Sequence, residues 1–152
     1  MKLGKYPIIQ VYLAEIDKLY QKKAGLPFIF LVGATAELIL REISNDPKTA
    51  MEKLIAKAEK SRAISYKQSL LFEDIRMYRN KYTHISADKI LNEEISGLFF
   101  TDKNGLLQNV NETVLDDLTE NKLRKVFLMH IAGDSGSAYE TFKKLLKLLR
   151  SK

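Results

Sequence analysis

The sequence contains no cysteine, only three prolines and seven glycines among 152 residues. The lack of cysteine excludes a disulfide framework, a thiolate zinc site and a thiol nucleophile, and it is typical of a cytoplasmic protein. The longest uncharged apolar run, residues 24–36, contains Pro27 and falls short of the roughly 20 residues that a membrane-spanning helix needs. Glu15 and Asp17 interrupt any apolar region of a signal peptide. We therefore expect a soluble, unexported, cytoplasmic protein that does not interact with membranes.

Charge is the first positive feature. The chain has 25 Lys and Arg against 19 Asp and Glu, a net charge of +6 with an isoelectric point near 9.4. Such an excess favours contact with polyanions, RNA or DNA first among them, although a solvated basic surface with no such role is the alternative. Phosphate-binding glycine loops, the H-E-x-x-H zinc motif and the nucleophile elbow are all absent from the sequence.

Hydrophobic periodicity predicts mostly helix. The expected helices cover approximately residues 6–23, 27–43, 47–60, 65–84, 111–131 and 137–149, with a short helix possible at 87–95. Asn45-Asp46-Pro47 resembles a helix start, Ser65 with Gln68 resembles a capping box, and Ser137 with Glu140 resembles the cap of a last helix. Asn104-Gly105 between apolar segments predicts an irregular or hairpin insertion near residues 97–110. We predict a single all-α domain over residues 1–152, a bundle of about five to seven helices.

The segment FEDIRMYRNKYTHIS, residues 72–86, places basic residues and an asparagine around one of only two histidines. On a helical wheel Leu71, Ile75, Tyr78 and Tyr82 form one apolar stripe that faces the core. The remaining polar residues are predicted to point away from that core: Arg76, Arg79, Asn80, Thr83 and His84. Leu70 and Met77 leave apolar surface beside this group, which could meet another helix or a second copy of the chain.

This combination of side chains suits a scissile phosphate. Arginine presents a planar fork of donors to phosphate oxygens. Histidine can take a proton from a ribose 2′-hydroxyl or give one to a leaving 5′-oxygen, and asparagine can orient the imidazole. None of this chemistry requires a metal or another cofactor. The alternative is that basic residues in a last turn merely complement the helix dipole.

Arg79-Asn80-Lys81-Tyr82-Thr83-His84 resembles the R-N-x-x-x-H form of the R-x(4–6)-H motif of HEPN-domain proteins. The apolar segment PFIFLVGATAELILREI, residues 27–43, also resembles the family's apolar helix with an internal glutamate. The resemblance covers residues 7–86, whereas the helices expected in 111–150 match only as further helices packed on that core.

The resemblance implies a helical bundle that homodimerises and joins two motifs in one composite cleft. It further implies a metal-independent endoribonuclease that leaves a 2′,3′-cyclic phosphate and a 5′-hydroxyl, in a toxin–antitoxin or phage-defence setting with a possible partner protein. Carried onto this chain, His84 would be the acid or base, Arg79 would hold the phosphate and Asn80 would orient. Arg76, Lys81 and Thr83 would be auxiliary RNA contacts. A non-catalytic HEPN-like module that binds RNA, a nucleotide or a protein is the alternative.

Two departures from the family bear on its control. In one toxin branch of the family, a tyrosine lies two positions after the histidine, and a partner enzyme modifies it. Here Ile85 and then Ser86 follow the histidine, so this tyrosine is missing. The last 65 or so residues select no subfamily.

Three other features have two interpretations each. Glu37 either supports the motif, as in the family, or pairs with Arg41 one turn on. His130 and Asp134 are four residues apart and could either share a metal ion or have a purely structural role. Two ligands are too few for a metal site, so we expect the structural role. The basic amphipathic segment from Thr141 to Lys152 either docks on the bundle, which we expect, or rests on a membrane or RNA.

Overall fold

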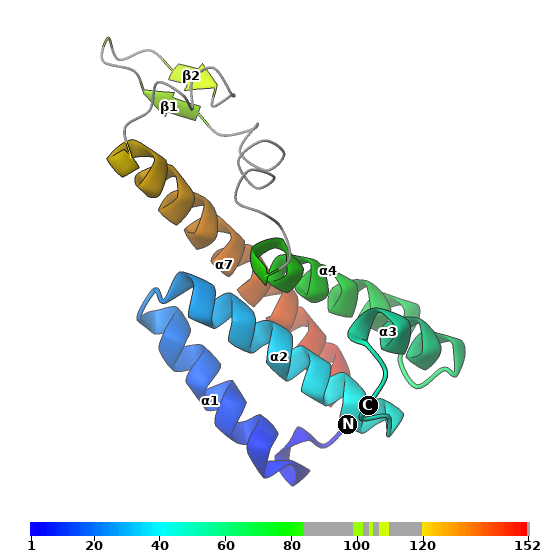
Figure 1. Cartoon of the computed structure of the whole chain (residues 1–152). Coiled ribbons are helices and arrows are strands. Elements are labelled where there is room, and N and C mark those ends of the chain that lie inside the picture. The colour runs from blue at the N-terminus through cyan, green and yellow to red at the C-terminus, as the bar shows by residue number, and fades with distance from the viewer. Residues whose placement is uncertain (84–98, 102–103, 105–106, 110–119, 152) are drawn as a thin grey trace.

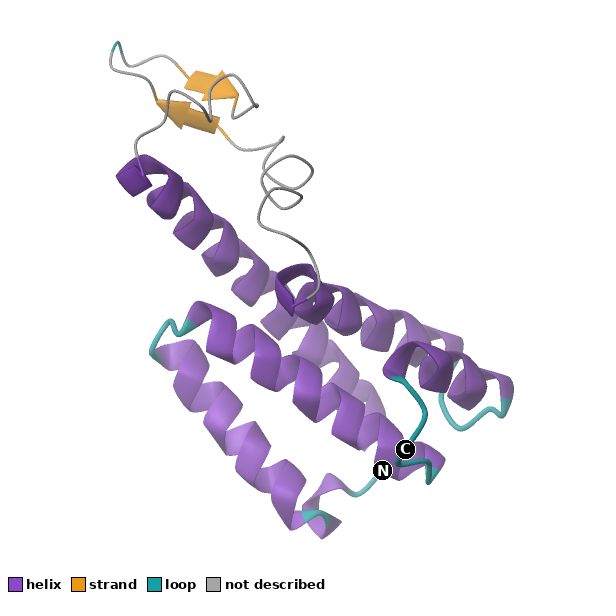
Figure 2. Cartoon of the chain, in the orientation of Figure 1, coloured by secondary structure: helices purple, strands orange, loops and turns teal. Residues whose placement is uncertain are grey.

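The computed structural model describes residues 1–83, 99–101, 104, 107–109 and 120–151. These residues form an all-α bundle with one small β-hairpin (Figures 1 and 2), as predicted. A 3-10 turn, η1, precedes five α-helices. The elements in chain order are η1 Leu3–Lys5, α1 Pro7–Gln21, α2 Gly25–Ser44, α3 Met51–Lys60, α4 Tyr66–Thr83, β1 Phe99–Thr101, β2 Leu107–Asn109 and α7 Glu120–Arg150.

Helix α2 is the centre of the bundle and packs against α1, α3, α4 and α7. Figure 1 shows α1 on one side of it and α4 on the other, with α7 crossing behind. A helix in this position must be apolar on several faces, because each neighbour needs a surface to pack on. The fully covered side chains lie on one broad face of about 120° at 100° per residue, and the partly buried Leu31 and Leu38 extend the apolar surface beyond it. The fully covered side chains are Phe28, Ile29, Val32, Ala36, Ile39 and Leu40.

Two glycines of α2 let neighbouring helices approach closely. A Cβ atom added at Gly25 would lie 2.7 Å from Cγ2 of Ile131 on α7. One added at Gly33 would lie 2.7 Å from Cδ and 2.8 Å from Cβ of Arg79 on α4. Contacts below 3.0 Å are not tolerated between carbon atoms, so α2 can hold these two partners at their present distance only with glycine at both positions.

The capping box predicted for α4 is confirmed. The backbone N–H of Gln68 donates to the Ser65 hydroxyl oxygen at 3.2 Å, and the backbone N–H of Ser65 donates to the Gln68 side-chain oxygen at 2.8 Å. The reciprocal pair satisfies two backbone donors that the helix start would otherwise leave open.

The start predicted for α3 at Pro47 is wrong, because α3 begins at Met51. Asn45 adopts a left-handed conformation (φ 49°, ψ 42°) and ends α2. The Asp46 carboxylate then accepts hydrogen bonds from the backbone N–H groups of Lys48 and Thr49. This local turn uses the capping chemistry that the sequence pattern assigned to a helix start.

The break predicted between two C-terminal helices is also wrong. Helix α7 is continuous from Glu120 to Arg150, through Gly133, Gly136 and Ser137. Each glycine costs a helix about 1 kcal/mol relative to alanine. Burial of Ala138, Phe142 and Leu145 on the following turns offsets that cost.

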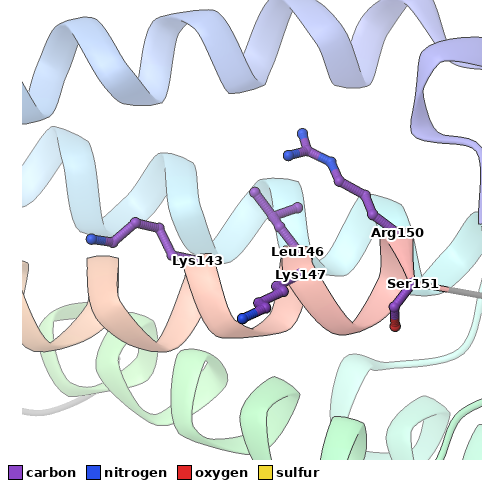
Figure 3. A pocket seen from close by; sticks show the side chains of 5 residues that line it. All are labelled: Lys143, Leu146, Lys147, Arg150 and Ser151. Atoms are coloured by element: carbon purple, nitrogen blue, oxygen red, sulfur yellow. The ribbon is translucent and has the colours of Figure 1, made fainter.

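The C-terminal part of α7 docks on the bundle, as expected for the basic amphipathic segment. Phe142, Leu145 and Leu149 are buried, and the N-terminal ammonium donates to the Leu149 carbonyl oxygen at 2.7 Å. The basic side chains remain at the surface, where a shallow pocket (Figure 3) is lined by Lys143, Leu146, Lys147, Arg150 and Ser151. None of the described helices is long and apolar enough to cross a membrane.

The hairpin is formed by β1 and β2, which pair antiparallel with Phe99 opposite Asn109 and Thr101 opposite Leu107. It falls within the insertion predicted near residues 97–110. The possible helix at 87–95 and the start of the helix predicted from residue 111 lie outside the described residues, which resume at Glu120.

Candidate functional site at the C-terminal end of α4

The apolar stripe predicted on α4 faces the core. Ile75 is 1% exposed, and Leu71, Tyr78 and Tyr82 are partly buried and packed against the same cluster. The wheel missed Phe72, which is fully buried and is one of the largest core side chains. The stripe therefore fixes the rotation of α4, and with it the direction in which the motif residues leave the helix.

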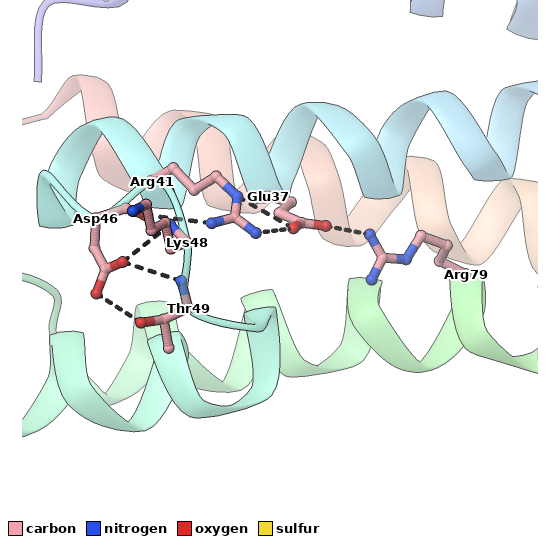
Figure 4. A network of polar contacts seen from close by, with 6 residues as sticks. All are labelled: Glu37, Arg41, Asp46, Lys48, Thr49 and Arg79. Carbon is pink, nitrogen blue, oxygen red and sulfur yellow. Dashed lines mark hydrogen bonds and ion pairs between the residues drawn. The ribbon is translucent and has the colours of Figure 1, made fainter.

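Arg79 is held against α2. Its Nη1 atom lies 2.5 Å from Oε2 of Glu37, and the first carbons of its side chain pass over Gly33. Both charged side chains are only 22–23% exposed. In Figure 4 the guanidinium of Arg79 points along α2 toward the Glu37 carboxylate. Glu37 thus makes the contact with the motif that the family resemblance implied.

Glu37 also makes the local contact that was its alternative interpretation. Nε and Nη2 of Arg41, one turn later on α2, lie 3.2 and 2.5 Å from Oε1 of the same carboxylate. Burial raises the pKa of Glu37, but the hydrogen bonds from Arg79 and Arg41 outweigh it and hold the pKa below its ordinary value. The carboxylate is therefore charged at neutral pH and bridges two arginines.

The Glu37–Arg41 pair continues to the turn after α2 (Figure 4). Nη1 of Arg41 donates to the Asp46 carbonyl oxygen at 3.3 Å. The Asp46 carboxylate in turn binds Lys57 of α3 at 2.7 Å and the hydroxyl of Thr49 at 2.8 Å. The hydrogen bond from Lys57, followed by those from Thr49, lowers the pKa of Asp46. A line of alternating charges thus connects α3, α2 and the motif of α4.

The prediction that all the polar residues point away from the core is wrong for the two arginines. Arg76 is 19% exposed; it binds Glu73 on its own helix, with Nε 2.9 Å from Oε2, and lies 4.0 Å from Glu52 on α3. The hydrogen bonds that Arg76 donates to the Glu73 carboxylate raise the pKa of Arg76. The Cβ atom of Arg79 itself faces α2, because it would lie 2.8 Å from a Cβ atom added at Gly33. The long side chain of Arg76 instead bends toward carboxylates within reach.

The other predicted site residues occupy different environments. Asn80 is half-buried, and its Oδ1 atom is covered without a hydrogen-bond partner among the described residues. Thr83 is exposed and its hydroxyl donates to the Arg79 carbonyl oxygen at 3.1 Å. Lys81 is only 13% exposed and pairs with Asp134 of α7 at 2.8 Å. His84, predicted as the acid or base, lies outside the described residues.

Asp134 connects α7 to the last turn of α4. Its Oδ2 atom accepts a hydrogen bond from the Tyr82 hydroxyl, pairs with Lys81 and lies 3.5 Å from Nε2 of His130. The His130–Asp134 pair is therefore a contact within a polar cluster of four residues. No group of three potential metal ligands occurs in the described part of the chain. Sequence reasoning missed the role of Asp134 because its two partners on α4 lie 52 and 53 positions earlier in the chain.

One side of α4 carries apolar residues that no described helix covers. Tyr66, Leu70 and Met77 are 67%, 48% and 60% exposed. Leu70 and Met77 are seven residues apart and therefore lie on one face of the helix. We call Leu70 and Met77 the apolar face of α4.

Comparison of the chain with models of known protein families, with curated proteins and with solved structures gave no match.

Proposed function

We propose that the protein is a metal-independent endoribonuclease of HEPN type, which cleaves single-stranded RNA at a site composed of two copies of the chain. The observation that carries the proposal is the ion pair between Arg79 and Glu37, which holds the motif arginine against α2. A residue that only complemented a helix dipole would need no such support from a second helix. The motif sequence and the net charge of +6 add to it.

Arg79 retains the donors that phosphate binding needs. The recorded ion pair uses Nη1, whereas a guanidinium has five N–H donors on three nitrogens. The Glu37 carboxylate fixes the orientation of the planar group, so the remaining donors are preorganised for the oxygens of a phosphate. Glu37 acts in this proposal as a positioning residue.

The reaction follows from the side chains. His84 takes the proton of a ribose 2′-hydroxyl, and the 2′-oxygen attacks the adjacent phosphorus. Arg79 stabilises the charge that develops on the phosphate oxygens, and Asn80 orients the imidazole. The bond from phosphorus to the 5′-oxygen breaks, and this oxygen takes up a proton from a protonated imidazole of the composite site. The products are a 2′,3′-cyclic phosphate and a 5′-hydroxyl.

The apolar face of α4 supports a second copy as the partner. Its two exposed residues, Leu70 and Met77, lie on the helix that carries Arg79 and Asn80. In a symmetric dimer the same patch serves both subunits, so an α4–α4 contact brings the two motifs together. A toxin–antitoxin or phage-defence role is part of the proposal through the family resemblance alone.

The test is cleavage of single-stranded RNA in EDTA by the wild type and by His84→Ala. The wild type should produce 2′,3′-cyclic phosphate ends and His84→Ala should not. His130→Ala, which removes the only other histidine, is the control and should keep cleaving. Arg79→Lys keeps a positive charge for Glu37 but loses the planar fork, so it should also lose cleavage, whereas Arg62→Lys on an exposed turn should not. Equal cleavage by all variants would refute the assignment.

One observation favours the non-catalytic alternative. Arg76 and Arg79 are both already paired with carboxylates and are mostly covered. A module of this kind would bind RNA or a partner protein without cleaving RNA. It predicts RNA binding that weakens steeply as salt rises, with no new RNA ends in the assay above.

A further inference from the structure

A second concave site lies away from the motif, where the turn between α1 and α2 meets the middle of α7. It is a cavity of about 820 Å³. Small-molecule sites in proteins have volumes of roughly 300–1,000 Å³ and mostly apolar walls. The lining residues fit that description: Leu19, Tyr20, Gln21, Lys23, Ala24, Gly25, Leu26, Pro27, Phe28, Leu128, Ile131, Ala132 and Ser135.

The two most buried side chains that line this cavity, Phe28 and Ser135, form what we call its floor, and neither side chain offers a free polar hydrogen. Phe28 is fully buried and Ser135 is 8% exposed. The Ser135 hydroxyl donates to the Ile131 carbonyl oxygen at 2.8 Å, with the Gly25 carbonyl oxygen 3.4 Å away. Its only proton is thus committed to the backbone. A charged group placed at the floor would lose its hydration without compensation, so the deep part of the cavity selects an apolar group.

The rim is different, because it is polar and carries positive charge. Gln21 and Lys23 line the cavity and are exposed to solvent. Lys23 pairs with no carboxylate among the residues that the structure describes, whereas Lys18 on the preceding turn pairs with Glu15 at 2.7 Å. No acidic residue is among the described residues that line the cavity. An anionic group at the rim would therefore meet a lysine and an amide while keeping part of its hydration.

The walls are held in place before any ligand arrives. The ring of Tyr20 stacks on Tyr139 with centroids 4.1 Å apart, and Phe28 contacts both rings at 5.2 and 5.7 Å. On the other side, the close approach of Ile131 to Gly25 fixes the distance between α2 and α7. A preformed cavity binds its ligand without first having to order its own side chains.

We propose that this cavity binds a small amphipathic anion, with an apolar body between α2 and α7 and a carboxylate or other anionic end at Lys23. The proposal is independent of the ribonuclease activity, because no lining residue belongs to the motif. The volume of about 820 Å³ suits a molecule of fatty-acid size. A docked acidic peptide helix would need a longer open groove, since a helix is about 10 Å across.

The test uses decanoate as the ligand and a fluorescent amphipathic anion, 1-anilinonaphthalene-8-sulfonate, as the reporter on the full chain. Saturable binding of the reporter and its displacement by decanoate are expected. Ala132→Phe places a ring in the cavity from an exposed position of α7 and should weaken decanoate binding about tenfold or more. Ala56→Phe, at an exposed position of α3 outside the cavity, is the matched control and should bind as the wild type does.

Lys23→Glu tests the charge at the rim. It should weaken decanoate binding about fivefold or more, while displacement by the uncharged decanol stays within twofold. Wild-type binding that Ala132→Phe leaves unchanged would overturn the assigned site, and equal loss of decanoate and decanol in Lys23→Glu would overturn the anionic end. If decanoate does not displace the reporter, the proposal as a whole is overturned. The same holds if only an acidic amphipathic peptide displaces the reporter.

Discussion

Replacing Glu37 with glutamine removes the charge that bridges Arg79 and Arg41 and leaves the side-chain shape almost unchanged. Oε2 of Glu37 lies 2.5 Å from Nη1 of Arg79, Oε1 lies 2.5 Å from Nη2 of Arg41, and the three side chains are 22–23% exposed. An exposed ion pair contributes about 0.2–1 kcal/mol, whereas hydrogen bonds to charged groups contribute about 1.5–3 kcal/mol. The ion pairs of Glu37 with Arg79 and Arg41 are partly covered, so we expect their contribution to lie between these two ranges. We expect Glu37→Gln to lower the free energy of unfolding by about 2 kcal/mol.

This loss is measurable by thermal unfolding. In a domain of this size about 1 kcal/mol corresponds to a shift of about 2–4 °C, so the melting temperature should fall by about 4–8 °C. Glu42→Gln is the matched control, because Glu42 is an exposed residue of the same helix that forms no ion pair within the described part of the chain. It should change stability by less than about 0.5 kcal/mol.

The pH dependence supplies a second readout. The pKa of Glu37 is lower in the folded chain than its ordinary value of 4.5, so the folded state binds fewer protons there than the unfolded state. The stabilisation is therefore present at neutral pH and is lost as the pH falls below 4.5 through the folded-state pKa. The difference between wild type and Glu37→Gln should shrink in that range. A Glu37→Gln variant as stable as Glu42→Gln at pH 7 would refute the inference that this carboxylate holds Arg79.

Two further predictions concern the contacts of α4. Gly33→Ala should lower the free energy of unfolding by about 1–3 kcal/mol despite the better helix propensity of alanine, because the new Cβ meets Arg79 at 2.7 Å. Gly136→Ala adds a Cβ with nothing within 4 Å and should raise the free energy of unfolding by about 1 kcal/mol. Urea unfolding measures both, and equal signs would contradict the close approach at Gly33. Asp134→Asn weakens the contacts with Tyr82 and Lys81 and should cost about 1–3 kcal/mol in the same assay, whereas an unchanged midpoint would show that α7 does not hold the last turn of α4.

The sequence predicted the helices well where residues close together in the sequence determine their limits. The ranges of α1 and α2 follow from apolar spacing, and Ser65 with Gln68 marks the start of α4. The prediction was wrong at Asn45-Asp46-Pro47, a pattern that occurs both in turns and at helix starts. It was also wrong at Gly133 to Ser137, a pattern that can either end a helix or lie within one. The turn at Asp46 and the continuous α7 are decided by contacts with Lys57 of α3 and by burial of the following turns.

The candidate site shows the same limit. The sequence predicted which side of α4 faces the core, and it offered both Arg41 and the motif as partners of Glu37. That Glu37 contacts both depends on the distance between α2 and α4, which Gly33 sets. The link from Asp134 to Tyr82 joins residues 52 positions apart and has no local signal.

The most direct test of the proposed function is RNA cleavage in EDTA as a function of protein concentration, with the mass in solution measured on the same samples. If the site is composed of two copies, the rate per chain should rise with the fraction of dimer. Met77→Asp should reduce both together, whereas Val11→Asp, at a position 56% exposed on α1, should reduce neither. Cleavage by a strict monomer, or a dimer of wild type that cuts no RNA in a varied panel, would contradict the account.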